Sequence, residues 1–106
     1  MEITVADAPE RGRFEVHVDG RLAGFATYHV DEGVMTLPHT EVDPSMSGRG
    51  VGTALVAGLL SAVRERSLTV LPYCSFIRKY LLDHPGDLDL VAEADREKFG
   101  LATADL

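Results

Sequence analysis

The sequence predicts a mixed α/β domain built on a mostly antiparallel sheet. Three observations lead to this prediction. Residues 3–42 contain runs in which apolar and polar positions alternate, which is the period of a half-buried strand. A glycine-dense segment, a helical apolar pattern and a short apolar strand follow in that order. A strand, a helix and a further strand form a crossover that sets the two strands in parallel.

Four strands are expected in the first half of the chain, over residues 3–5, 13–18, 21–30 and 34–42. In the second of them, Phe14, Val16 and Val18 share one face. Asp19-Gly20 then gives the strongest short signal of a hairpin. Pro38 has no N–H group for a ladder hydrogen bond, so the fourth strand is expected to contain an edge or a bulge at this position.

Two helices and one more strand are expected in the second half. Residues 51–66 carry apolar residues at steps of three and four, on one helical face: Val51, Leu55, Val56, Leu59, Leu60 and Val63. Residues 68–71 form a short apolar strand. Residues 75–82 predict a second helix, whose apolar stripe comprises Phe76, Ile77, Tyr80 and Leu81. Leu88, Leu90 and Val91 are candidates for a last short strand.

The charge of the chain is acidic and unevenly distributed. The net charge is −7, and residues 83–106 contribute −5 of it. We expect one domain over residues 1–91 and an acidic C-terminal tail over residues 92–106 that is either helical or flexible. A broad basic surface for nucleic acid is excluded, because neutralising phosphates requires clustered lysine and arginine.

The sequence carries no signal for export, a membrane span or a metal cluster. Its first residues lack the basic and apolar regions of a signal peptide, and it contains no run of about 18 apolar residues. Cys74 is the single cysteine, which excludes an internal disulfide and a thiolate metal cluster. We therefore expect a soluble cytoplasmic domain without a metal, a membrane or a nucleic-acid partner.

A glycine loop at residues 48–52 is the strongest functional signal. It belongs to the segment Ser47-Gly48-Arg49-Gly50-Val51-Gly52-Thr53, which lies between a strand and a helix. Glycines allow a ligand to approach the backbone closely, and the N–H groups of a first helical turn suit a phosphate. The alternative is a tight turn whose glycines serve packing. Neither a Walker loop nor the dinucleotide-binding fingerprint fits the spacing.

Four segments taken together resemble the GNAT superfamily of N-acetyltransferases, and in particular its short YjdJ-like branch. They are Leu37-Pro38-His39-Thr40-Glu41-Val42, the glycine loop, Leu71-Pro72-Tyr73-Cys74-Ser75-Phe76 and His84-Pro85. The resemblance covers about residues 10–91. It implies a mixed sheet whose parallel pair of strands splays apart around acetyl-CoA or coenzyme A as cosubstrate. The usual acceptor-site helices are lacking, because only a turn fits between Val5 and Arg13.

The resemblance also implies where the cosubstrate binds. The pyrophosphate would lie on the loop amides, and the pantetheine arm would pair with the backbone of Val42. The cofactor-binding residues carried over in this way are Val42, Ser47, Gly48, Arg49, Gly50, Val51, Gly52 and Thr53. The superfamily pattern Gln/Arg-x-x-Gly-x-Gly/Ala maps onto Ser47, Gly50 and Gly52, and Ser47 departs from its first position.

Four side chains are candidates for catalysis: His39, Glu41, Cys74 and Tyr80. His39 and Glu41 are two residues apart on one strand and so share a face, and a histidine titrates near neutrality, as a general base requires. The alternatives are a surface histidine and a solvated carboxylate. Cys74 is either an acetyl-accepting nucleophile with His39 as its base or a small buried apolar residue. Direct attack on the thioester is the usual route of the superfamily.

Tyr80 either protonates the leaving thiolate or packs in the core. The expected function is acetyl-CoA-dependent N-acetyl transfer to a small amine or a protein amine. Two alternatives stay open. One is a coenzyme A-binding or regulatory module with little catalysis, which the missing acceptor helices suggest. The other is a nucleotide-phosphate binder that shares only the glycine bend.

Overall fold

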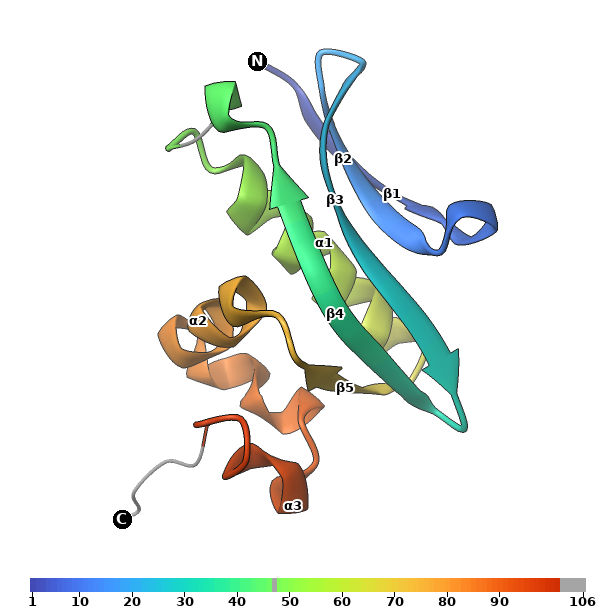
Figure 1. Ribbon diagram of the computed structural model, residues 1–106, viewed down its shortest axis with the longest axis vertical. Helices are drawn as coiled ribbons and strands as arrows, with labels where there is room; N and C mark the ends of the chain where they lie inside the picture. Colours follow the sequence, from blue (N-terminus) through green and yellow to red (C-terminus); the bar gives the residue numbers. More distant parts are fainter. Residues whose placement is uncertain (47, 102–106) are drawn as a thin grey trace.

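The computed structural model describes residues 1–46 and 48–101. Its five strands form one sheet in the order β1-β2-β3-β4-β5, as Figure 1 shows. They are β1 (Ile3–Ala8), β2 (Arg13–Val18), β3 (Arg21–Asp31), β4 (Val34–Val42) and β5 (Thr69–Pro72). The first four pair antiparallel, and β4 pairs with β5 in parallel. The predicted mixed, mostly antiparallel sheet is confirmed.

The long helix α1 (Val51–Glu65) covers one face of this sheet. Six apolar residues of α1 are buried, and they are the six that the helical spacing predicted: Val51, Leu55, Val56, Leu59, Leu60 and Val63. They pack on the strand residues that point to the same side, among them Phe14, Val16 and Met35. The approach is close at Gly58, where an added Cβ would lie 2.8 Å from Cγ1 of Val5.

A bulge in β4 changes which face its side chains occupy. Thr27 pairs with His39 and His29 pairs with Thr36, so Tyr28 opposes two residues, Leu37 and Pro38. The bulge lies where the proline predicted an edge or a bulge. Before it, Met35 and Leu37 are buried in the core. After it, His39 is opposite Thr27 on the face of the sheet that α1 does not cover.

The parallel pair separates after a short stretch of pairing. β5 pairs with Val34–Leu37 only, whereas β4 continues to Val42 paired with β3. After β5 the chain turns into α2 (Ser75–Asp83), which lies beside the separated end of β4 (Figure 1). A gap is therefore present between the second half of β4 and the start of α2, as the splayed pair predicted.

The C-terminal part of the chain differs from the prediction in one element. The short strand expected at Leu88, Leu90 and Val91 is wrong, because residues Pro85–Leu90 form the 3-10 helix η3. Pro85 at its first position favours a helical turn, and Arg64 of α1 binds Asp87 and Asp89 within it at 3.1 and 2.9 Å. A short helix α3 (Glu93–Arg96) follows.

The segment beyond residue 91 contributes to the core. Phe99 and Leu101 are buried in the same cluster as the residues of α1. Between β1 and β2 the chain forms the single turn η1 (Pro9–Arg11), so the face of the sheet opposite α1 has no helix between these two strands to cover it. None of the helices in the described ranges has the length and apolar character needed to cross a bilayer.

Candidate functional site

A pocket of about 490 Å³ lies between the end of β4 and the start of α1. The short 3-10 helix η2 (Pro44–Met46) and the glycine loop form its rim. Its described lining residues are Val42, Pro44, Met46, Gly48, Gly50, Val51, Gly52, Thr53 and Phe76. Six of the eight residues expected to bind the cosubstrate thus line one pocket. Its volume lies within the range of small-molecule sites.

The first turn of α1 presents backbone N–H groups at this pocket. Gly50 caps the helix in the left-handed conformation with φ +77°, and no side chain caps the N-terminus. The first N–H groups of a helix have no intrahelical partner, and the helix dipole favours an anion there. Gly48 also has a positive φ, and an added Cβ at Gly48 or Gly50 would meet nothing within 4 Å. The left-handed backbone, and not a lack of space, therefore favours glycine at both positions.

Gly52 is required by the neighbouring helix rather than by backbone strain. A Cβ at this position would lie 2.6 Å from Cζ of Phe76. Phe76 belongs to the first turn of α2, is 43% exposed and forms a wall of the pocket. The absence of a side chain at Gly52 therefore lets the aromatic ring close the pocket against the first turn of α1. The pocket thus offers amide donors on one wall and an apolar ring on another, which fits a phosphate-bearing ligand with an apolar arm.

The separated half of β4 provides polar backbone groups along the gap. The N–H group of Asp43 bonds to the carbonyl oxygen of Ala23 on β3. Because the hydrogen-bonding direction alternates along a strand, the backbone groups of Thr40 and Val42 face away from β3 and into the gap. An extended chain lying in the gap can pair with them as a further strand would.

Cys74 lies at the vertex of the gap, where the chain leaves β5. Its N–H group bonds to the carbonyl oxygen of Leu37, the last residue of β4 that pairs with β5. Its thiol donates to Oγ1 of Thr40 at 3.2 Å. The side chain is partly buried. The thiol is therefore directed at β4, at the closed end of the gap.

His39 and Glu41 form a pair on the uncovered face of the sheet. Nε2 of His39 and Oε1 of Glu41 are 2.9 Å apart, and the side chains are 57% and 64% exposed. The His39 ring also approaches Phe25, with ring centroids 6.2 Å apart. Thr40 lies between His39 and Glu41 in the sequence, and its side chain points to the other face of β4. The structure thus joins His39 to Glu41 and joins Cys74 to Thr40.

Tyr80 lies apart from these groups, on the next turn of α2. Its ring stacks on His84 at a centroid distance of 3.9 Å. Both line a small cavity of about 130 Å³ that shares Thr53 and Phe76 with the larger pocket. Burial raises the pKa of Tyr80, and the charge of Asp87 adds to this effect. Among the described residues no hydrogen bond joins Tyr80 to His39, Glu41 or Cys74.

Among the described residues of the predicted cofactor-binding set, Arg49 is the one that does not line the pocket. Arg49 is exposed in the loop, where its N–H group bonds to the carbonyl oxygen of Met46. Ser47 lies outside the described residues. Sequence reasoning missed Thr40, whose partner is 34 positions away. It also assigned Phe76 to the apolar stripe of the second helix, whereas Ile77 and Leu81 are buried and Phe76 lines the pocket.

Comparison with known families adds an independent observation. A model of the GCN5-related N-acetyl-transferase family matches residues 13–90. The chain belongs to the GCN5-related N-acetyltransferase family. Of the structural features described above, the splayed parallel pair and the glycine loop at the start of α1 lie within the matched region. The YjdJ-like branch stays a prediction.

Two individual proteins are also similar to this chain in sequence. Protein NATD1 of Mus musculus is 31% identical over 85 residues, which are 78% of this chain and 77% of that protein. Mycothiol acetyltransferase of Clavibacter sepedonicus is 46% identical over 48 residues, but the match spans 45% of this chain and 16% of that relative.

Two solved structures are also similar. A GCN5-like protein from Staphylococcus aureus matches with a TM-score of 0.62 at 25% identity, over 85% of this chain and 86% of that one. The ribosomal-protein-S18-alanine N-acetyltransferase from Escherichia coli matches with a TM-score of 0.53 at 29% identity, over 55% of this chain and 38% of that enzyme. The first of these matches covers nearly the whole fold.

Proposed function

We propose that this protein transfers the acetyl group of acetyl-CoA to an amine. The observation that carries the proposal is the N-terminus of α1, which no side chain caps and whose glycine loop lines the pocket at one end of the gap. The chain belongs to a family of acetyltransferases. An acidic protein can hold a polyanion there through backbone amides. Among the described residues, Arg49 is the cation of the loop.

The residues that would hold acetyl-CoA follow from the pocket. The N–H groups of Val51, Gly52 and Thr53 would bind the pyrophosphate, and Phe76 would cover the start of the pantetheine arm. The backbone groups of Thr40 and Val42 would pair with the amides of that arm. Acetyl-CoA supplies an acetyl thioester, and these contacts would direct it toward Thr40 and Cys74 at the vertex.

His39 is the proposed base for the acceptor amine. An amine with a pKa of about 10.4 is mostly protonated at neutral pH, and its deprotonation costs about 4.6 kcal/mol. A histidine held by a carboxylate is suited to take up that proton, because the carboxylate orients the ring. Glu41, 2.9 Å from the ring, has this role in the proposal.

We propose direct attack of the amine rather than an acetylated Cys74. The supporting observation is that the thiol donates to Thr40, while the imidazole pairs with Glu41 on the opposite face of β4. A nucleophilic thiol needs a base within hydrogen-bonding distance, and the hydrogen-bond partner of this thiol is Oγ1 of Thr40 and not the imidazole of His39. In this scheme Cys74 and Thr40 line the closed end of the gap.

A thermal-shift comparison followed by an acceptor screen tests the proposal. At about 100 times its dissociation constant a ligand adds about 2.7 kcal/mol of stability, so acetyl-CoA and coenzyme A should raise the melting temperature while ATP at equal concentration should not. Amines should then be screened for acceptor-dependent release of coenzyme A.

The outcomes separate the alternatives. Equal stabilisation by ATP would indicate a general nucleotide-phosphate binder. Stabilisation by acetyl-CoA without release of coenzyme A by alkyl amines, polyamines or peptides would indicate a binding module. No stabilisation by acetyl-CoA would overturn the proposal.

A further inference from the structure

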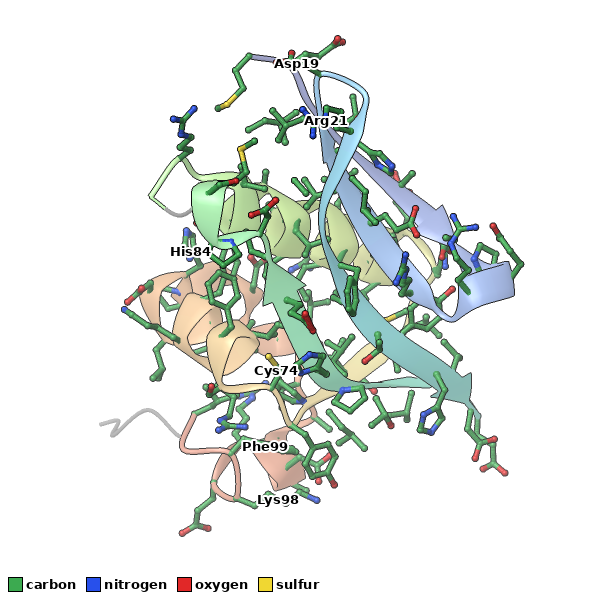
Figure 2. All side chains as sticks on the ribbon, turned by 45° about the horizontal axis from the view of Figure 1, so that its top comes forward. Asp19, Arg21, Cys74, His84, Lys98 and Phe99 are labelled. Carbon is green, nitrogen blue, oxygen red and sulfur yellow. The ribbon has the colours of Figure 1, made fainter. Side chains whose placement is uncertain are left out.

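A second pocket, of about 530 Å³, lies outside the cofactor site. Its lining residues are Tyr73, Arg78, Lys98 and Phe99, and none of them lines the pocket at the start of α1. Two of the four come from the segment that follows α3. Figure 2 shows Lys98 and Phe99 together at one end of the molecule, with Cys74 above them.

Two aromatic rings form the apolar part of this pocket. Tyr73 and Phe99 meet edge to face, with centroids 5.0 Å apart and planes inclined by 82°. Phe99 is 8% exposed and belongs to the hydrophobic core, so its position is fixed by packing. Tyr73 is 50% exposed. A rigid ring therefore supports a second ring whose surface is available to a planar ligand.

Two cations form the polar part. Nζ of Lys98 lies 5.1 Å from the centroid of Phe99 and 5.7 Å from that of Tyr73, within the range of a cation–π interaction. Nη1 of Arg78 donates to the carbonyl oxygens of Pro72 and Tyr73, which fixes the guanidinium against the end of β5. A guanidinium has further N–H donors on its other two nitrogens.

The described lining of this pocket carries positive charge and two aromatic rings. The chain carries a net charge of −7, yet the described residues that line this pocket include no carboxylate. Arg11, Arg13, Arg64, Arg66 and Lys79 are all paired with acidic side chains. Within residues 1–46 and 48–101, five cations have no such partner: Arg21, Arg49, Arg78, Arg96 and Lys98. Of these five, Arg78 and Lys98 line this pocket. Two cations without a carboxylate partner therefore converge beside two aromatic rings.

We propose that this pocket binds a small aromatic carboxylate. The ring of the ligand would stack on Tyr73, and its carboxylate would bind Lys98 and Arg78 through charge-assisted hydrogen bonds. A cationic ligand is disfavoured by the two positive charges, and an anion without a ring would leave the aromatic surface uncovered. The pocket has a volume typical of sites for small molecules.

The second pocket lies next to the gap between β4 and α2 but is separate from the proposed coenzyme site. Tyr73 precedes Cys74, which lies at the vertex of the gap. The pocket and the proposed coenzyme site share no lining residue, so both ligands can be bound at once. The proposal does not depend on transferase activity, because it concerns binding alone.

Titration of the full chain, followed by backbone amide NMR, tests the proposal. The probes are phenylacetate, acetate and benzyl alcohol, each added in the presence and absence of coenzyme A. Phenylacetate should shift the amide signals of Tyr73, Lys98 and Phe99 saturably, with an affinity about tenfold higher than that of either other probe. Coenzyme A should leave this affinity unchanged.

A matched pair of variants completes the test. Lys98→Gln should weaken phenylacetate binding about threefold and leave the binding of benzyl alcohol as it is. Lys79→Gln, at an exposed lysine of α2, should bind like the wild type. Equal affinities for acetate and phenylacetate, unchanged phenylacetate binding in Lys98→Gln, or shifts confined to the glycine loop would each overturn the proposal. A failure of coenzyme A to bind would count against the transferase function and not against this pocket.

Discussion

The thiol of Cys74 donates a hydrogen bond to Oγ1 of Thr40, 3.2 Å away, across 34 positions of the sequence. This contact joins the chain after β5 to the separated half of β4 at the closed end of the gap. The thiol is therefore not hydrogen-bonded to the imidazole of His39, which is paired with Glu41 on the other face of the strand.

Replacement of Cys74 should preserve turnover. If the amine attacks the thioester directly, we expect Cys74→Ala to keep kcat within about threefold of the wild type, since the loss is one hydrogen bond at the end of the gap. Steady-state kinetics with an acceptor found by screening measures this. An acetylated Cys74 in mass spectra of the wild type, together with an inactive variant, would favour the covalent route.

Replacement of His39 should lower turnover without affecting the coenzyme. His39→Gln removes the proposed base and should reduce kcat about a hundredfold. The affinity for acetyl-CoA should be unchanged, because His39 lies on β4, away from the glycine loop at the start of α1. Comparing kcat with acetyl-CoA affinity by calorimetry checks this. A variant with wild-type kcat would show that another group accepts the proton.

Alanine at Gly50 should weaken coenzyme binding beyond its effect on stability. Gly50 and Gly33 have φ values of +77° and +81°, and an added Cβ at either would meet nothing within 4 Å. Each substitution should destabilise the fold by about 1 kcal/mol, because an L-residue is strained in this conformation. Gly33 lies in the turn between β3 and β4, so Gly33→Ala is the matched control.

Coenzyme affinity, measured at a temperature where both variants are folded, should fall in Gly50→Ala alone. Equal affinities in the two variants would contradict the placement of the pyrophosphate at the start of α1.

Stability should depend on Glu15 in acid. Hydrogen bonds from Arg11 and Arg13 lower the pKa of Glu15 from its ordinary 4.5 to about 2. The stabilisation from this carboxylate is therefore complete above pH 4.5 and is lost as the pH falls from 4.5 toward 2. We expect the melting temperature of Glu15→Gln to fall less steeply over this window than that of the wild type. An exposed helix position, Glu65→Gln, should retain the wild-type slope.

Part of the site was predictable from the sequence because the patterns that indicate it each lie within a single segment of the chain. The alternation in residues 13–18 and the helical spacing in residues 51–66 report a strand and a helix directly, since each pattern reflects one buried face. The glycines and the position of Pro38 similarly report backbone geometry. These features indicated most of the residues that line the pocket at the start of α1.

Other parts depended on contacts between distant residues. Glu15 falls on the polar face of β2, as its spacing predicts, yet it is 5% exposed because Arg11 and Arg13 cover it. The apolar pattern at Leu88 to Val91 suggests a strand, whereas η3 forms where Arg64 binds its carboxylates. Phe76 matches an apolar stripe but closes the pocket against Gly52.

The sequence by itself thus determined the order of the elements from β1 to α2, the buried face of α1 and the loop at its N-terminus. These depend on backbone conformation and on the period of apolar residues, which a single segment expresses. The tertiary structure alone decided which side of β4 each polar residue faces, what Cys74 bonds to, and that the chain beyond α3 joins Tyr73 and Arg78 in a second pocket. Those outcomes depend on a bulge and on side chains that only the folded chain brings together.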